Sequence, residues 1–425
     1  MSKAIRAALS DPKATGQAPY AEFALTLYAF MSRLRAELAE RQATEVLFCS
    51  REGQFLTRVF ERYQEGHGEL ERIAAHYFLV SRRSTLLPGL GTIDEEEFAG
   101  LRSSFPKLTN AGFLHSLSLL DHIEQTHLDL EAPLDLAAIR TDPAVRHVYE
   151  LRRKEQSSLL TGYVSDLTGS EDGTLHIVDV GWRGSTQDHL TAAFSDTRAV
   201  RGYYMGLVAE RPIAHLDAKS ALVFGPSSDS YRHYRVLKHF KMIWEYVLGA
   251  DHGSVAHYEP DSDGKSQPVL DPVDVELADF GEVVGPMQEG IFETFDRLCN
   301  VDGFDSLSQT TLQDLVARHH SRMLFFPTST ELSIAWHRGH YANFGEPWVK
   351  ETPQRIEVTA AQRLRNLGGL ARHPGRVLRG FPPLTLYKLG LEPLIPIVGW
   401  YRQLREFPPK PLAKLSRLRG ARRQR

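Results

Sequence analysis

Short apolar runs, each ending in polar residues and followed by a helical pattern, constrain the fold of this chain more than any other feature. The runs have the length and apolar content of buried strands. They lie at residues 44–49, 76–80, 174–180, 200–208 and 220–225. Strand–loop–helix units in this order predict an α/β fold with an open, mostly parallel sheet flanked by helices. Residues 94–168 show few strand signals and predict a large helical insertion.

Polar clusters stand at the ends of three of these runs. They are "SREG" after the first run, "SRR" after the second and "DVGWRGST" at the end of the third. In open α/β sheets, ligands bind outside the carboxyl ends of the strands. Because parallel strands end at the same edge, we expect the three clusters to meet in one pocket.

The first cluster has the chemistry of a diphosphate site. Ser50, Arg51 and the amides around Gly53 would lie at a helix N-terminus, where oriented N–H donors, a forked cation and the helix dipole favour an anion. Glu52 lies inside the same loop and is a candidate general base. A capped helix with exposed Arg51 and Glu52 is an equally good reading of this stretch.

The second cluster offers two arginines where a strand emerges. Neighbouring strand residues point to opposite faces, so one of Arg82 and Arg83 could reach a ligand while the other pairs with an acid. Arginine suits bidentate phosphate contact better than lysine does. A surface salt bridge is the alternative reading.

The third cluster is the most specific. Asp179 could accept hydrogen bonds from two adjacent sugar hydroxyls, and Gly181 and Gly184 would allow close backbone approach. Donors for a terminal phosphate follow in the residues Ser185, Thr186 and Gln187. An ordinary strand-to-helix turn with an Asp cap is the alternative. Together the clusters would hold the parts of phosphoribosyl diphosphate (PRPP): a diphosphate, a pentose and a monophosphate.

The motifs also resemble known families. The pattern around Asp179 resembles the PRPP loop of phosphoribosyltransferases, although Val180 stands where a second acid is usual and the loop is a residue shorter, which argues against a purine or pyrimidine salvage enzyme. The set "LFCSREGQFL", "YFLVSRRSTLLP", "IVDVGWRGSTQ" and "GYYMGL" is similar to the glycan phosphoribosyltransferase domain of bacterial dual-domain ribofuranosyltransferases, over roughly residues 20–345.

That resemblance implies transfer of 5-phosphoribosyl from PRPP to a hydroxyl of a glycan acceptor, in polysaccharide biosynthesis such as that of capsules and O-antigens. The fused haloacid-dehalogenase-type phosphatase of that family is not expected here, because no Asp-x-Asp strand end precedes the first strand. A separate phosphatase would then remove the 5′-phosphate to leave ribofuranose.

We expect Asp179, Arg51 and Glu52 to be the catalytic residues. Arg183 and the acid Glu245, which lies on an apolar helical pattern, are candidates for substrate binding. Mg²⁺ is the expected cofactor, and it would bind mainly through the substrate phosphates, so no protein metal motif is expected.

The C-terminal segment differs in charge from the rest of the chain. Residues 361–425 hold fifteen Lys/Arg and two acids, a net charge of +13, whereas the whole chain carries −3. Leu, Ile, Trp400 and Tyr401 accompany these cations, a combination typical of interfacial membrane binding. We therefore expect an α/β domain at 1–350 and, at 351–425, a Pro/Gly-interrupted basic tail that contacts an anionic membrane. A disordered basic tail with nonspecific nucleic-acid contacts is the alternative, but no nucleic-acid partner is expected.

The sequence also gives an expected cellular location and two alternative functions. Two cysteines and the absence of a signal-peptide pattern or a long apolar run favour a cytoplasmic protein, peripheral at the inner face of the membrane. A nucleotide-sugar glycosyltransferase is a second enzymatic reading, although its usual D-x-D motif matches only 261–263, in a polar turn. A non-catalytic module that senses PRPP or a nucleotide is the third reading.

Overall fold

A computed structural model of the chain describes residues 2–9, 18–104, 107–209, 212–226, 231–238, 241–272, 279–338, 358–373, 375 and 382–407. The chain forms two compact units. The sheet unit comprises Arg33–Leu222 and Leu248–Val283, and the helical unit comprises Met1–Ser32, Val223–Val247 and Val284–Arg425. The described residues 358–373, 375 and 382–407 fall in the helical unit, whereas the expected boundary near residue 351 lies outside the described residues.

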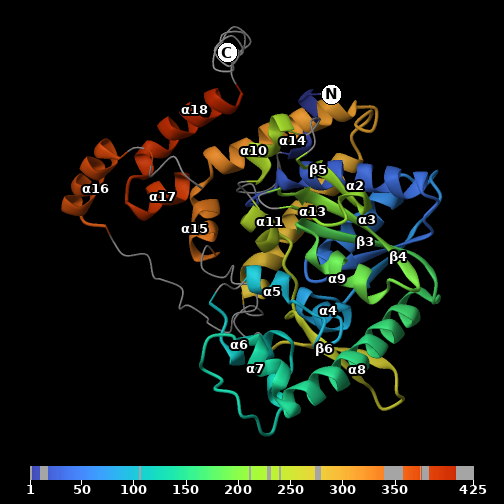
Figure 1. The fold of residues 1–425 in the computed structure, drawn as a ribbon. Helices are drawn as coiled ribbons and strands as arrows, with labels where there is room; N and C mark the ends of the chain where they lie inside the picture. Colours follow the sequence, from blue (N-terminus) through green and yellow to red (C-terminus); the bar gives the residue numbers. More distant parts are fainter. Residues whose placement is uncertain are drawn as a thin grey trace, which may run out of the picture. The chain divides into compact units, whose positions relative to one another are not determined.

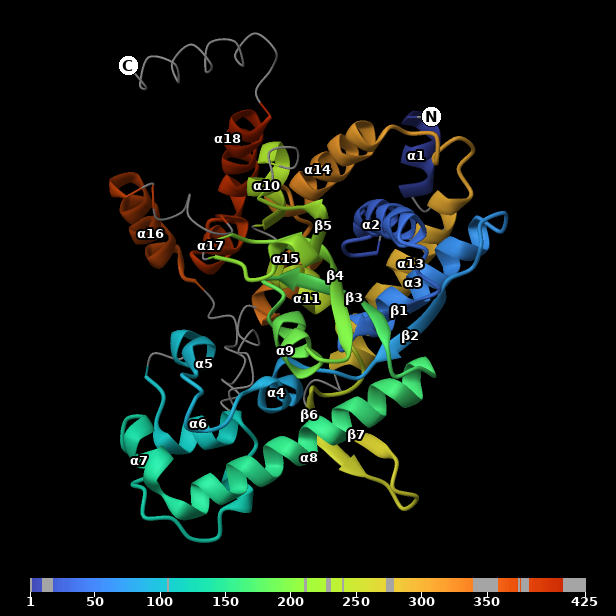
Figure 2. The same cartoon turned by 45° about the vertical axis from the view of Figure 1, so that its right-hand side comes forward.

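The sheet unit is built on five strands in the order β2–β1–β3–β4–β5 (Figures 1 and 2). The first four of these in sheet order pair in parallel. Their bounds are β1 (Glu45–Cys49), β2 (Ala74–Phe78), β3 (Gly173–Trp182), β4 (Arg198–Leu207) and β5 (Lys219–Phe224). Each strand coincides with one of the expected apolar runs, so the α/β fold with an open, mostly parallel sheet is confirmed.

Both faces of this sheet are covered, as the near-continuous apolar runs require. Alternate residues of β1 serve the two faces. Leu47 and Cys49 join a core with Leu160 of α8 (Pro143–Thr168) and Leu190 of α9 (Ser185–Ala193). On the other face, the ring of Phe48 lies 5.5 Å from that of Phe60 in α3 (Gly53–Gly66).

The expected helical insertion lies between β2 and β3. Its helices are α4 (Arg82–Leu86), η1 (Leu87–Gly89), α5 (Ala99–Ser104), α6 (Asn110–Ser116), η2 (Leu120–His122), α7 (Leu136–Thr141) and α8. They enclose a core of their own, in which Phe98, Phe113 and Tyr149 pack edge to face. Asp142 caps the start of α8 through the amides of Ala144 and Val145.

An antiparallel hairpin of β6 (Val255–Pro260) and β7 (Ser266–Leu270) packs against α8. Figure 2 shows it beside that helix. The only D-x-D sequence, 261–263, forms the hairpin turn, where the Asp261 carboxylate accepts bonds from the amides of Asp263 and Lys265. This aspartate therefore has a structural role in the turn.

The helical unit gathers helices from three distant parts of the sequence. They are α1 (Ser2–Leu9), the start of α2 (Phe23–Glu40), α10 (Tyr231–Lys238), α11 (Lys241–Val247), α13 (Gly285–Cys299), α14 (Gln309–Phe325), α15 (Ser329–Arg338), α16 (Ala360–Arg372), α17 (Pro382–Lys388) and α18 (Ile395–Glu406). Residues 408–425, the most basic part of the tail, lie outside the described residues.

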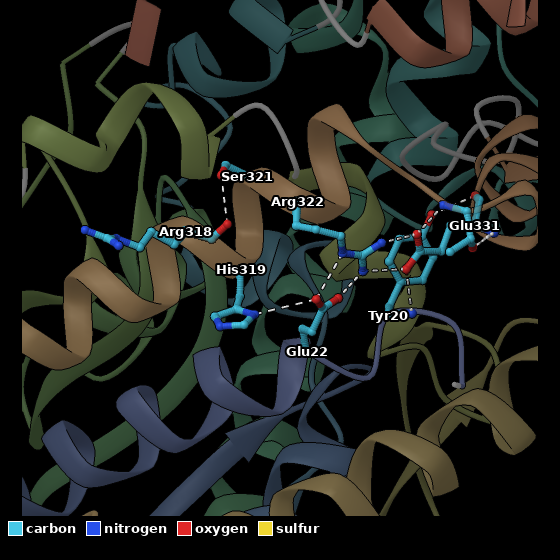
Figure 3. Close-up of polar contacts among 8 residues, drawn as sticks. Tyr20, Glu22, Arg318, His319, Ser321, Arg322 and Glu331 are labelled. Atoms are coloured by element: carbon cyan, nitrogen blue, oxygen red, sulfur yellow. Dashed lines mark hydrogen bonds and ion pairs between the residues drawn. The ribbon is translucent and has the colours of Figure 1, made fainter. Parts of the chain in front are cut away.

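A buried ionic network holds α14, α15 and the residues just before α2 together (Figure 3). Arg322 of α14 pairs with Glu22, just before α2, and with Glu331 of α15 at 2.7 Å. Glu331 also accepts a bond from the amide of Tyr20 at 3.1 Å, and its backbone carbonyl accepts one from the Tyr20 hydroxyl at 2.8 Å. Because Arg322 satisfies both carboxylates, these charges can be buried together.

Candidate functional site

The order of the strands places a topological switch point between β1 and β3. The chain leaves β1 through α3 to reach β2 on one side, and it leaves β3 through α9 to reach β4 on the other. Ligands of open α/β sheets bind where the connections of neighbouring strands diverge in this way. The loops at 50–53 and 183–186 follow these two strands, so the first and third polar clusters both stand at the switch point.

The second cluster is tied to the first by Ser50. Its amide donates to the carbonyl of Phe78 at 2.9 Å, and its hydroxyl donates to the carbonyl of Val80 at 2.8 Å. These bonds hold the start of the loop at 50–53 against the segment that leads to Arg82.

Asp179 of the third cluster is influenced by charged residues of the other two. Burial and the nearby Glu52 carboxylate raise the pKa of the Asp179 carboxyl to about 7, against the opposing effects of the Gly181 amide and the Arg82 guanidinium. The bond from the Gly181 amide is long, at 3.4 Å. A carboxylate has about four acceptor sites, so the side chain retains capacity for other donors. The charges of Glu52 and Arg82 thus act on Asp179, whereas the meeting of the three clusters in one pocket stays a prediction.

The two arginines of the second cluster are not in a strand. The strand ends at Phe78, and Ser81 caps a helix through a reciprocal pair of bonds with Ser84, so Arg82 and Arg83 begin α4. Arg83 donates to Asp271 and to Ser118, each at 3.0 Å, whereas Arg82 is exposed and influences Asp179. Arg83 thus pairs with an acid, as one of the two arginines was expected to, but from a helix N-terminus and not from a strand. Contact of Arg82 with a ligand stays a prediction.

The glycines of the third cluster are required by the protein's own backbone. Both have positive φ, +135° at Gly181 and +72° at Gly184. A Cβ at Gly181 would lie 2.0 Å from the carbonyl oxygen of Gly206, and one at Gly184 would lie 2.6 Å from the hydroxyl of Tyr204. At Gly53, a Cβ would lie 2.5 Å from the carbonyl oxygen of Phe48. Close packing between neighbouring elements explains these glycines without a ligand.

Gln187 is a correction to the expected binding set. Its side chain is fully buried, and its amide nitrogen donates to the carbonyls of Val200 and Ala218, both at 3.0 Å. Its side-chain oxygen accepts from Tyr204 at 2.7 Å. Both N–H donors are therefore used within the fold, and Gln187 braces α9 instead of binding phosphate.

The remaining donors of this cluster differ in the exposure of their side chains. Ser185 and Thr186 are half-buried at the first turn of α9, and Arg183 is exposed in the loop before it. Lys219 supports this loop by donating to the Arg183 carbonyl at 3.2 Å and to the Asp188 carboxylate at 2.5 Å. The Asp188 carboxylate is therefore already engaged in an ion pair.

Glu245 belongs to a different unit from the three polar clusters. It lies in α11 of the helical unit, whereas the clusters belong to the sheet unit. Its side chain is half-buried. A role for Glu245 in substrate binding stays a prediction.

Sequence reasoning missed a group of side chains at the rim of the first cluster. Gln54 donates to Asp251 at 2.7 Å, and Tyr77 lies 2.5 Å from Nε2 of His252. Burial raises the pKa of Tyr77, and the carboxylates of Glu52 and Asp251 add to that shift. The stretch "GADHGS" has no recognised spacing, so only the fold reveals that it returns to this edge.

The tautomer of His252 follows from its partners. Its Nδ1 lies 2.7 Å from the carbonyl of Gly253, which can only accept, so Nδ1 carries the hydrogen. In that tautomer, Nε2 accepts from the Tyr77 hydroxyl. The Tyr77 oxygen keeps its lone pairs available to a further donor.

Neither a metal site nor a match to known proteins identifies the function of this chain. Among the residues that the structure describes, no group of three or more His, Cys, Asp or Glu side chains is placed to hold a metal ion. Comparisons of the sequence with protein-family models and with curated proteins found no match.

Proposed function

We propose that the sheet unit transfers 5-phosphoribosyl from PRPP to a hydroxyl of a bacterial glycan and releases diphosphate. The observation that carries this proposal is the position of Asp179. Its partly satisfied carboxyl lies at a topological switch point, next to Glu52 and Arg82 and between the N-termini of α3 and α9. A sugar-binding acid between two anion-binding helix starts matches a pentose with phosphate at both ends.

Each part of PRPP has a matching group in this arrangement. The Asp179 carboxylate would accept bonds from the ribose hydroxyls. The amides and hydroxyls of Ser185 and Thr186 would hold the 5′-phosphate, and Arg51, Arg82 and the first turn of α3 would bind the diphosphate.

The transfer needs charge stabilisation more than covalent chemistry. The acceptor hydroxyl attacks ribose C1 as diphosphate leaves, through a transition state with oxocarbenium character. Arg51 and Arg82 would stabilise the charge that develops on the leaving diphosphate. Glu52, which is close enough to influence Asp179, would accept the proton of the acceptor hydroxyl.

The donor atoms at this edge fit Mg²⁺. Carboxylate oxygens are preferred ligands, and the mutual repulsion of Glu52 and Asp179 would be relieved by a cation. When bound with PRPP, the ion would be held mainly by the substrate phosphates and would neutralise charge on the diphosphate, with the negative potential of Glu52 and Asp179 favouring a cation at this edge.

Titration calorimetry with PRPP, with and without Mg²⁺, tests the site, and diphosphate release with a glycan acceptor tests the reaction. We expect PRPP binding to be lost in Asp179→Ala with the fold intact. We also expect kcat to fall about 10²–10⁴-fold in Glu52→Gln, with PRPP affinity retained. Preferential binding of UDP- or GDP-sugars would favour the nucleotide-sugar reading. Tight PRPP binding without turnover would favour a sensor.

The location is part of the same proposal. Within the described ranges, every helix is too short or too polar to cross a bilayer. We propose that the protein is peripheral at the cytoplasmic face of the cell membrane, where a lipid-linked glycan would be presented to it. A separate phosphatase would act on the 5′-phosphate of the product.

A further inference from the structure

Helix α18 has two faces of opposite character. Its inner face packs against the end of α14: Gly399 contacts Phe325 and Phe326, and the Gln403 side chain accepts a bond from Ser321 at 2.9 Å. The guanidinium of Arg402 lies 5.7 Å from the ring of Phe325. These contacts fix the orientation of the helix within the helical unit.

The outer face of α18 is apolar. It consists of four residues spaced three and four apart, which places them on one side of a helix. They are Ile397, Trp400, Tyr401 and Leu404, with 65%, 62%, 52% and 52% of their surfaces exposed. Trp400 is also held in place by an edge contact with Phe326 at 5.7 Å between ring centroids. A contiguous apolar face turned away from its own unit indicates an interaction surface.

Charge and side-chain type identify the partner. Exposed Arg405 borders the apolar face of α18. Helix α16 also exposes two leucines, Leu364 and Leu367, among the exposed arginines Arg363, Arg365 and Arg372. Aromatic and aliphatic residues bordered by arginine suit the interface of an anionic bilayer, where rings lie at headgroup depth and cations meet lipid phosphates.

We infer that the outer face of α18, formed by Ile397, Trp400, Tyr401 and Leu404, docks the protein on an anionic phospholipid surface, with the arginines of α16 as supporting contacts. This inference deepens the membrane location proposed above by naming the surface that makes the contact. It does not depend on the chemistry of the sheet unit.

Co-sedimentation of the full-length protein with phospholipid vesicles tests this inference. The triple variant Ile397→Gln/Trp400→Gln/Leu404→Gln changes exposed residues only, and circular dichroism and the melting temperature verify its fold. Leu151→Gln is a matched control, because Leu151 is 57% exposed on α8 of the sheet unit. Vesicles rich in phosphatidylglycerol are compared with vesicles of phosphatidylcholine alone.

We expect the triple variant to bind phosphatidylglycerol vesicles at least about tenfold more weakly than the wild type, and Leu151→Gln to bind like the wild type. Arg363→Gln/Arg365→Gln should reduce binding and its dependence on salt. Equal retention of the wild type and the triple variant would overturn the inference. The inference would also be overturned if the wild type does not bind vesicles but dimerises through this face, as measured by sedimentation velocity. Because no step requires PRPP, failure of the docking surface and failure of the transferase proposal give separate results.

Discussion

Lys219 and Asp188 form an ion pair at 2.5 Å in which the lysine side chain is completely buried. The pair joins the start of β5 to the first turn of α9, and Lys219 also donates to the backbone carbonyl of Arg183 in the preceding loop. Burial raises the pKa of Asp188, and the hydrogen bond and charge of Lys219 oppose that shift. The ion pair therefore supports the loop that would meet the 5′-phosphate.

Removing one partner of this pair should destabilise the sheet unit. We expect Lys219→Met to lower the free energy of unfolding by about 3–5 kcal/mol, because it leaves a partly buried carboxylate without its cation. The double variant Lys219→Met/Asp188→Leu should recover most of that loss. Urea denaturation of the wild type, both single variants and the double variant measures the coupling. Additive losses would show that the two side chains do not depend on each other.

The pKa of Asp179 predicts a pH-dependent stability. The folded protein holds this proton up to about pH 7, whereas an unfolded chain releases it near pH 4. The stabilising contribution is thus fully present below about pH 4 and is lost as pH rises through about 7. Asp179→Asn removes this titration. The free energy of unfolding of Asp179→Asn minus that of the wild type should be larger at pH 8 than at pH 5. The increase should be about 1–2 kcal/mol after allowance for the partial exposure of Asp179.

Chemical denaturation at the two pH values measures this difference. Asp196→Asn, at an exposed site just after α9, is the control and should show no such trend. An Asp179→Asn stability difference that stays constant between pH 5 and pH 8 would contradict the shifted pKa.

The neighbours Arg82 and Arg83 offer a matched pair for the ligand site. We expect Arg82→Gln to weaken PRPP binding about 10–100-fold with little change in stability, because the guanidinium is exposed and close enough to influence Asp179. Arg83→Gln should lower stability by releasing Asp271 and Ser118, while PRPP affinity stays within about threefold of the wild type. Calorimetric titration and thermal melting separate the two effects. The reverse pattern would assign the ligand contact to Arg83.

The architecture of the sheet was accessible from sequence because it depends on local patterns. Runs such as 44–49 and 174–180 are apolar enough to be strands wherever they lie, and the rule that parallel strands share an edge then brings Ser50 and Asp179 together. The start of α4 was harder to locate, because Ser81 and Ser84 form a cap without the acidic residue that usually signals one.

Other features depend on partners that are remote in sequence. Gln187 looked like a ligand donor because Val200, Tyr204 and Ala218, which satisfy it, approach only in the folded sheet. The same holds for Tyr77 and His252, which are separated by 175 positions in the chain. Sequence motifs depend on fixed spacings along the chain, so they do not reveal pairs of residues that the fold brings together from distant positions. The division into two units is hidden for the same reason, since the helical unit is assembled from three separate segments.

The ionic network of the helical unit permits a stringent test with a control on the same helix. Arg322 compensates two buried carboxylates, Glu22 and Glu331, which are 9% and 2% exposed (Figure 3). Arg322→Met leaves Glu331 without its cation and Glu22 with only His319, at 3.5 Å, so we expect a loss of about 3–5 kcal/mol in the free energy of unfolding. Arg318→Met, one turn earlier on α14 at an exposed position, should change stability by less than about 0.5 kcal/mol. Replacing the carboxylates as well, in Arg322→Met/Glu22→Gln/Glu331→Gln, should restore part of the loss, because it removes the uncompensated charges. If thermal melting finds Arg322→Met as stable as Arg318→Met, the network does not hold α14, α15 and the residues just before α2 together.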